Sequence, residues 1–205
     1  MYKKVFGFID KIIPEPVCEL NYTKDYELLI AVMLSAQTTD KRVNEVTSIL
    51  FSKYDSLEKL SNANVSDIEK IIFSLGNYTK KSLAVVEIGK RLLESDKRLD
   101  DREFLESLPM VGRKTASVVL SELYNIPNIA VDTHVERVSK RLGFSCDDDS
   151  VLEVERKLKE EIPKDKWCRS HLQLVHFGRY YCTAKNPMCD KCELSNICKY
   201  KKRNS

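Results

Sequence analysis

The chain has 205 residues, of which 34 are basic and 31 acidic, and its net charge is +3 at pH 7. This length suffices for one large domain or two small ones, and the nearly balanced charge does not by itself indicate a nucleic-acid-binding protein. The longest apolar run, Leu28 to Leu34, is far too short to span a membrane, so we expect no membrane association.

The first ten residues lack the apolar core of a secretory signal, which favours a cytoplasmic location. After them, several segments carry apolar or small side chains at the i, i+3, i+4 spacing of a helix. The positions that share this spacing are Val43, Val46, Thr47 and Leu50; Ile68, Ile71, Ile72 and Leu75; Val85, Ile88 and Leu92; and Val151, Val154 and Leu158.

Two of these segments also carry start signals. Asp40 is placed to cap the first helix, and Ser150 with Glu153 forms a capping box before the last. No stretch shows the sustained alternation of a strand. The sequence therefore predicts an all-α fold of about ten helices joined by short turns.

The segment Leu108 to Ala116 reads Leu-Pro-Met-Val-Gly-Arg-Lys-Thr-Ala. A helix should end before Pro109, Gly112 permits a tight turn, and a second helix should run from near Arg113 to about Tyr124. Unpaired backbone N–H groups at the start of that helix can bind a phosphate without reading a base. The segment therefore predicts a helix–hairpin–helix that contacts a nucleic-acid backbone.

Lys114 falls in the first turn of this second helix, where the helix dipole disfavours an ammonium and where partial burial would lower its pKa further. A lysine so placed can act as an amine nucleophile that attacks a sugar carbon and forms a Schiff base. The alternative is a solvated or phosphate-binding lysine.

Asp132, in Val-Asp-Thr-His, is placed to cap a helix from Thr133 to Leu142. A capping carboxylate could also help a lysine to lose its proton, or stabilise positive charge on a sugar. His134 follows two residues later, and a packing role is the simpler interpretation for it.

Four of the seven cysteines lie near the end of the chain with the spacing C-x6-C-x2-C-x5-C, at Cys182, Cys189, Cys192 and Cys198. Thiolates so close in sequence can converge on one metal centre. Disulfides would need an oxidising compartment. Zinc sites usually pair two short hooks, whereas only Cys189 and Cys192 form one here. The unequal loops favour a [4Fe-4S] cluster, with zinc as the alternative.

Taken together and in this order, the hairpin, the Val-Asp-Thr-His segment and the four cysteines resemble the endonuclease III family. The segment Leu28 to Asp40 also resembles an early core helix of that family, and the resemblance covers about residues 20 to 200. It implies two α-helical domains with a DNA-binding cleft between them. A six-helix barrel would span residues 21–128, and residues 1–20 and 129–205 would form the iron–sulfur cluster domain.

The same resemblance implies a bifunctional DNA glycosylase and abasic-site lyase of base excision repair, which excises oxidised pyrimidines from duplex DNA. Lys114 would be the nucleophile and Asp132 its partner, and the four cysteines would hold a [4Fe-4S] cluster. The lysine would displace the base, and β-elimination from the Schiff base would break the strand on the 3′ side. We expect a cytoplasmic, nucleoid-associated monomer that binds damaged double-stranded DNA.

Two turns depart from the family pattern. Met110 stands where the hairpin usually has a glycine, so its backbone is expected at φ < 0. Asn77, between Gly76 and Tyr78, stands where a large apolar wedge is common, and Gln37 is the matching candidate on the other side. Both could hydrogen-bond to the orphaned base or fill the gap left by a flipped nucleotide. Each could also be an ordinary turn residue.

The loop from Thr183 to Met188 is less basic than is common in the family, with Lys185 as its only cation. DNA binding is therefore expected to depend more on Arg113, on Lys191 and on the hairpin backbone at Met110 and Gly112.

Three other functions compete with this interpretation. A mismatch adenine glycosylase shares the cysteine spacing and the aspartate but lacks a lysine at the position of Lys114. A non-catalytic metal-dependent DNA-binding module needs neither Lys114 nor Asp132, and a small electron-transfer iron–sulfur protein needs no long helical part. The presence of both Lys114 and Asp132 favours the glycosylase and lyase.

Overall fold

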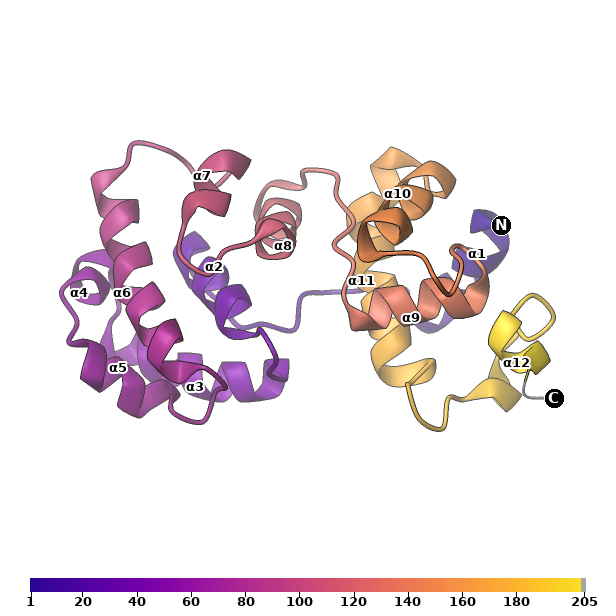
Figure 1. Cartoon of the computed structure of the whole chain (residues 1–205), viewed down its shortest axis with the longest axis horizontal. Coiled ribbons are helices and arrows are strands. Elements are labelled where there is room, and N and C mark those ends of the chain that lie inside the picture. Colours follow the sequence, from indigo (N-terminus) through magenta and orange to yellow (C-terminus); the bar gives the residue numbers. More distant parts are fainter. Residues whose placement is uncertain (204–205) are drawn as a thin grey trace. The chain divides into compact units, whose positions relative to one another are not determined.

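The computed structural model describes residues 1–203, and the regular secondary structure of this part is entirely helical, without a strand (Figure 1). The all-α prediction is confirmed. The described residues form twelve α-helices where about ten were expected. Two of the twelve have only five residues each, α4 (Leu57–Ser61) and α12 (Lys199–Arg203), too short to leave a periodic apolar pattern in the sequence.

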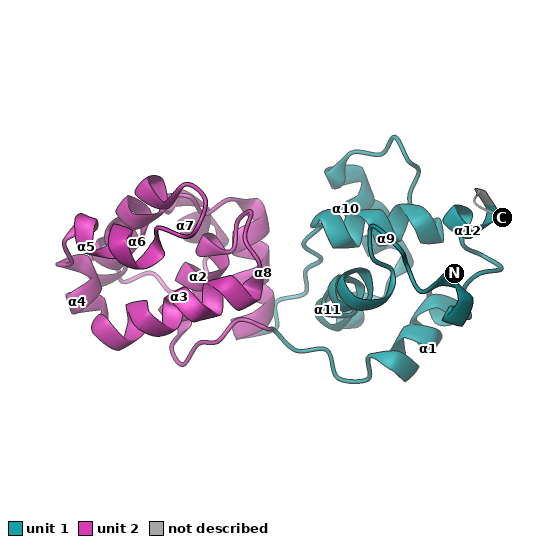
Figure 2. Cartoon of the chain, turned by 90° about the horizontal axis from the view of Figure 1, so that it is seen from below, with its two compact units in different colours: residues 1–18, 125–205 teal, residues 19–124 magenta. Residues whose placement is uncertain are grey.

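The chain divides into two compact units, drawn in different colours in Figure 2. One contains residues 1–18 and 125–205, and the other residues 19–124. The family resemblance implied residues 21–128 for the barrel domain, which corresponds to the unit of residues 19–124. The last two residues of the expected 129–205 segment lie outside the described part of the chain.

The unit of residues 19–124 is built around one helix that is buried on nearly every side. This is α2 (Asp25–Leu34), in which every side chain from Tyr26 to Leu34 is buried. The other helices of the unit are α3 (Asp40–Lys53), α4, α5 (Val65–Ile72), α6 (Tyr78–Glu94), α7 (Arg102–Ser107) and α8 (Arg113–Tyr124). Helices α3, α6 and α8 pack on α2, and α7 packs on α8.

The start of α3 differs from the sequence prediction. The cap is Thr39, whose hydroxyl accepts a hydrogen bond from the backbone N–H of Arg42, and not Asp40. Asp40 is instead the first helical residue, where its negative charge is favourable near the positive end of the helix dipole. The predicted apolar face is confirmed, because Val43 and Leu50 are fully buried.

The other unit packs α1 (Tyr2–Ile12) with the later part of the chain. Its further helices are α9 (Thr133–Leu142), α10 (Val151–Glu161), α11 (Trp167–His176) and α12, with a π-helical turn at Phe177–Tyr181 and 3-10 turns at Lys164–Lys166 and Cys189–Lys191. Its core includes Ile9 of α1, Val138 of α9 and Leu158 of α10. The predicted capping box of Ser150 and Glu153 is present at the start of α10.

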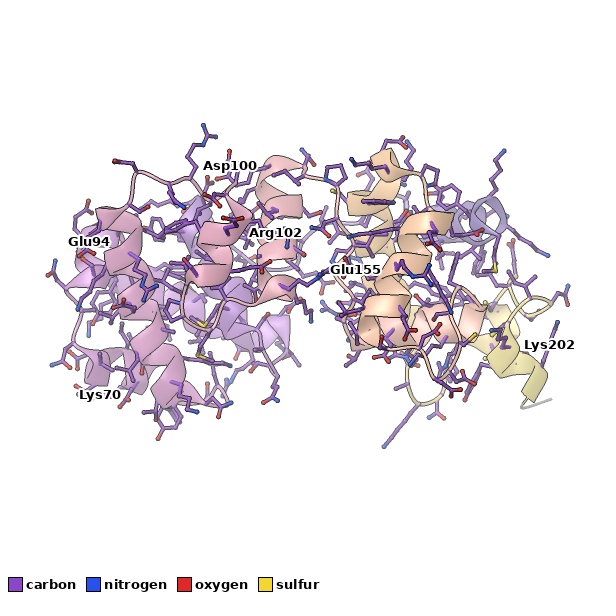
Figure 3. All side chains as sticks on the ribbon, turned by 45° about the horizontal axis from the view of Figure 1, so that its top comes forward. Lys70, Glu94, Asp100, Arg102, Glu155 and Lys202 are labelled. Atoms are coloured by element: carbon purple, nitrogen blue, oxygen red, sulfur yellow. The ribbon has the colours of Figure 1, made fainter. Side chains whose placement is uncertain are left out.

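Charged side chains extend outward from both units, as Figure 3 shows for Lys70, Glu94 and Lys202. Many form exposed ion pairs one helical turn apart, such as Arg102 with Glu106 at 2.9 Å, and each contributes little stability. Within residues 1–203, no helix is both long and apolar enough to cross a membrane.

Candidate active site and metal centre

The predicted helix–hairpin–helix is present. Helix α7 ends at Ser107, before Pro109, and α8 begins at Arg113. The backbone N–H of Val111 donates to the carbonyl of Leu108 at 3.1 Å and closes the turn. The side chain of Val111 is buried and anchors the turn in the core, so the backbone at the start of α8 is held in a defined position.

The prediction of φ < 0 for Met110 is wrong. Its φ is 60°, in the left-handed region: Met110 is the third residue of the turn closed between Leu108 and Val111, the position at which a type II turn has a positive φ. The Met110 side chain is 42% exposed, so it avoids a steric conflict with the core, and the backbone strain is about 1 kcal/mol.

Gly112 is the glycine of this hairpin, and a Cβ atom added to it would meet nothing within 4 Å. The φ of Gly112 lies outside the left-handed region, so its backbone conformation does not require a glycine. The packing of the chain therefore gives no reason for a glycine at this position. Close approach of an external ligand to the backbone is a reason that remains.

Lys114 is the second residue of α8 and is exposed, so the expected partial burial is wrong. The buried face of α8 includes Ala116, Val119 and Leu120, and Lys114 lies outside it. The consequence for chemistry is that the amine is open to a bound substrate.

Asp132 caps α9, as predicted, and it uses one carboxylate oxygen to do so. Its Oδ1 accepts hydrogen bonds from the backbone N–H groups of His134 at 2.9 Å and Val135 at 2.7 Å. The other oxygen, Oδ2, takes no part in these two cap hydrogen bonds. Capping and chemistry are therefore compatible roles for this half-buried residue.

Two arginines of α9, which the sequence analysis did not single out, hold the segment around Cys182. Arg137 donates to the carbonyl of Gly178 at 2.6 Å and to that of Cys182 at 3.2 Å. Arg141 donates to the carbonyl of Thr183 at 2.7 Å and to Sγ of Cys182 at 3.4 Å. Arg137 and Arg141 are four residues apart and therefore lie on the same side of α9. This spacing is the feature by which the sequence could have identified them as a pair.

Gly178, in the π-helical turn, allows α9 to approach closely. A Cβ atom on this glycine would lie 2.9 Å from Cβ of His134 and 3.1 Å from Cγ2 of Val138. His134 therefore packs against the π-helical turn, which agrees with the simpler interpretation of this residue. The helix that carries Asp132 is thus fixed to the segment that leads into the cysteines.

The four predicted cysteines line one pocket, together with apolar side chains that include Leu142 and Phe177. Burial raises the pKa of the Cys182 and Cys192 thiols, and the hydrogen bond from Arg141 opposes this at Cys182.

Within residues 1–203, no three His, Cys, Asp or Glu side chains form a ready group around a single metal ion. A [4Fe-4S] cluster takes one cysteine thiolate on each of its four irons. Four thiols around one largely apolar pocket therefore fit a [4Fe-4S] cluster.

The remaining candidates are turn and loop residues, all of them exposed. Gln37 and Asn77 have φ values of 59° and 57°, both left-handed. Asn77 is the cap residue of α6, yet its side chain makes no capping hydrogen bond. Lys185 and Lys191 lie on the other unit, in the segment between the first and third cysteines.

Comparison with known proteins gives a consistent result. Residues 30–164 match the family model described as HhH-GPD superfamily base excision DNA repair protein. Endonuclease III of Bacillus subtilis (strain 168) is 44% identical, over 96% of this chain and 92% of its own length. Endonuclease III of Escherichia coli (strain K12) is 38% identical, over 93% and 90%.

Among solved structures, a trapped endonuclease III–DNA covalent intermediate with an estranged adenine matches with a TM-score of 0.93. It is 42% identical, and the match covers 100% of this chain and 98% of that one. A non-covalent endonuclease III–DNA complex matches with a TM-score of 0.94 and 43% identity, over 99% of this chain and 96% of that one. The chain belongs to the endonuclease III family of the HhH-GPD superfamily of base excision DNA repair proteins.

Proposed function

We propose that this protein is a bifunctional DNA glycosylase and abasic-site lyase that excises oxidised pyrimidines from duplex DNA, with Lys114 as nucleophile and Asp132 as its partner. The observation that carries the proposal is the exposed amine of Lys114 in the first turn of α8, directly after the hairpin. A relative 42% identical to this chain forms a covalent intermediate with DNA, which supports a nucleophilic mechanism.

In the proposed reaction the damaged nucleotide is first flipped out of the stack, because its glycosidic bond cannot be reached inside the duplex. The nitrogen lone pair of Lys114 forms a bond to C1′, and the electrons of the glycosidic bond leave with the base, which takes up a proton. The sugar ring opens to an iminium ion. This ion acidifies the C2′ proton, and its loss drives the electrons toward C3′ and breaks the bond to the 3′ phosphate oxygen.

Asp132 supports this sequence through its charge. Oδ1 remains on the cap of α9, and Oδ2 is available to stabilise positive charge on the sugar or to take the proton of the attacking amine. Because the cap fixes the carboxylate in place, no conformational freedom is lost when it acts.

The hairpin supplies phosphate binding that does not depend on sequence. The N–H groups at the start of α8 point out of the helix end, and the positive end of the helix dipole favours an anion there. At Gly112 a phosphate oxygen can come close to the backbone, since no Cβ stands in the way. Arg113, Lys185 and Lys191 are exposed cations that add charge for the same partner.

Gln37 and Asn77 are proposed to fill the gap that the flipped nucleotide leaves. Both side chains stand on exposed left-handed turns. The amide of Asn77 is not used in capping α6, so it can hydrogen-bond to the base opposite the lesion.

Cys182, Cys189, Cys192 and Cys198 are proposed to hold a [4Fe-4S] cluster. Bound there, the cluster would join residues 182–198, the cysteine segment, into one rigid piece. Arg137 and Arg141 hold the carbonyls of Cys182 and Thr183 on α9. The cysteine segment and the helix that carries Asp132 therefore form one structural block.

The test is borohydride trapping on a thymine-glycol duplex. The wild-type protein should give a covalent adduct, and Lys114→Ala should give none while still binding DNA, because the hairpin amides remain. Lys41→Ala is a matched control, since Lys41 is an exposed lysine at the second position of α3. It should trap like wild type.

Loss of trapping in both lysine variants would contradict the assignment of Lys114, as would trapping by Lys114→Ala. Base release by the wild type without any adduct would instead indicate a monofunctional enzyme, as in mismatch adenine glycosylases.

A further inference from the structure

Lys81 is a buried lysine that the reaction described above does not use. It lies in the first turn of α6 and is 1% exposed, among the largest fully buried side chains of the chain. Placing an ammonium in the interior is costly unless it is well hydrogen-bonded. Its Nζ atom donates to the carbonyl oxygens of Leu34 and Ala36, each at 2.9 Å, and burial lowers its pKa.

These two carbonyls lie at and just beyond the end of α2, which Figure 1 shows beside α6. The last carbonyls of a helix lack partners within the helix, and the negative end of its dipole favours a cation. The carbonyl of Ala36 also belongs to the peptide bond that joins Ala36 to Gln37. Its hydrogen bond to Lys81 therefore fixes the peptide plane directly before the left-handed residue Gln37.

The backbone of Lys81 makes the second connection. Its N–H donates to the carbonyl of Asn77 at 3.0 Å and closes the first turn of α6. Asn77 is itself left-handed. One residue thus contacts the backbone of the Asn77 turn through its N–H and the backbone of the Gln37 turn through its ammonium.

We propose that Lys81 is a positioning residue that holds the Gln37 turn and the Asn77 turn in a fixed mutual arrangement, so that both side chains can enter the base stack of a duplex. This rests on the proposed function, in which Gln37 and Asn77 fill the gap at the flipped nucleotide. A left-handed backbone costs about 1 kcal/mol at a residue such as Gln37 and persists only where its surroundings fix it. An apolar side chain at position 81 would fill the same space without fixing the turn.

The test is Lys81→Met, which keeps a long unbranched side chain in the core and removes both ammonium hydrogen bonds. Two substrates are compared under single-turnover conditions: a thymine-glycol duplex, and a single strand with a preformed abasic site. The duplex requires the turns to enter the stack, whereas the single strand has no opposite base and no stack to open. We expect duplex excision to fall by roughly tenfold or more, as for other small misplacements of positioning groups, and single-strand cleavage to change by less than about twofold.

The control is Val85→Ala, which shortens a fully buried side chain one turn further along α6. It destabilises the same unit by a cavity but leaves the contacts of Lys81 in place, so it should affect both substrates equally. Lys81→Gln serves as a second variant, because its shorter amide can still donate to one carbonyl. It should lie between wild type and Lys81→Met.

Several results would overturn the assignment. An equal loss on both substrates in Lys81→Met, or the same pattern in Val85→Ala, would mean that Lys81 serves general stability. If neither Lys81 variant folded, Lys81 would be a residue required for folding, and the proposal would also be rejected. If the wild-type protein failed to cleave either substrate, the proposed function would fail instead, so the two failures are distinguishable.

Discussion

The two proposed roles of Asp132, capping α9 and acting in the reaction, can be tested separately because its two carboxylate oxygens are used differently. The cap of α9 uses Oδ1, which accepts both backbone hydrogen bonds at 2.7 and 2.9 Å. Asp132→Asn keeps an oxygen at this position, and asparagine ranks with aspartate as a helix cap. The stability cost is therefore the charge at the helix N-terminus, about 0.3–1 kcal/mol.

The effect on chemistry should be much larger. The substitution replaces Oδ2 by a neutral amide nitrogen, which can neither take a proton nor stabilise a cationic sugar. Loss of such a group typically lowers the rate by about 10²-fold or more, which corresponds to about 2.7 kcal/mol in the activation free energy. This exceeds the stability cost, so the two roles can be told apart.

The assay is single-turnover excision of thymine glycol from a duplex, with thermal unfolding followed in parallel. Ser150→Ala is the matched control, since Ser150 caps α10 through its hydroxyl in the same unit. It should lose about 1 kcal/mol of stability and keep its excision rate. If Asp132→Asn excised the base at a near-wild-type rate with unchanged melting, Asp132 would be a cap and nothing more.

Three further outcomes are expected. Met110→Gly should raise the free energy of unfolding by up to about 1 kcal/mol in denaturant titration, because relief of left-handed strain outweighs the added freedom of the unfolded chain; a loss of stability would show that the Met110 side chain matters more than its backbone. Asn77→Leu should keep activity but flatten the preference between A and G opposite the lesion, by about the 1 kcal/mol of one hydrogen bond, and an unchanged A-to-G ratio in single-turnover cleavage would exclude base reading by Asn77. Anaerobically purified protein should contain about four irons and matching sulfide per chain, whereas stoichiometric zinc without sulfide would reject the cluster.

Local signals in the sequence were enough for the helices and for several caps. Pro109 forbids continuation of α7, and the Ser150–Glu153 box and Asp132 satisfy backbone donors of the residues next to them in the chain. Such interactions span three or four residues, so the sequence contains both partners. The same holds for the four cysteines, whose spacing brings them to one pocket.

Where two neighbouring residues could each serve, the sequence could not choose between them. Thr39 and Asp40 both suit the cap of α3, and the helix begins one residue earlier than the position of Asp40 suggested. The choice depends on how the turn after α2 leads into α3, and the packing of those helices sets that path. Met110 is similar, because its left-handed backbone follows from closure of the hairpin and not from the preference of methionine.

The motifs by themselves determined that the chain is helical and which side chains are the candidates for nucleophile, capping carboxylate and metal ligands. Only the tertiary structure decided that Lys114 is exposed, that Arg137 and Arg141 hold the cysteine segment on α9, and that Lys81 is buried at the end of α2. The physical reason is distance along the chain. Lys81 and its acceptor Leu34 are 47 residues apart, and Arg137 and the Cys182 carbonyl are 45 apart. No local pattern encodes such a pair, because folding brings the partners together only when α2 packs against α6 and α9 packs against the π-helical turn.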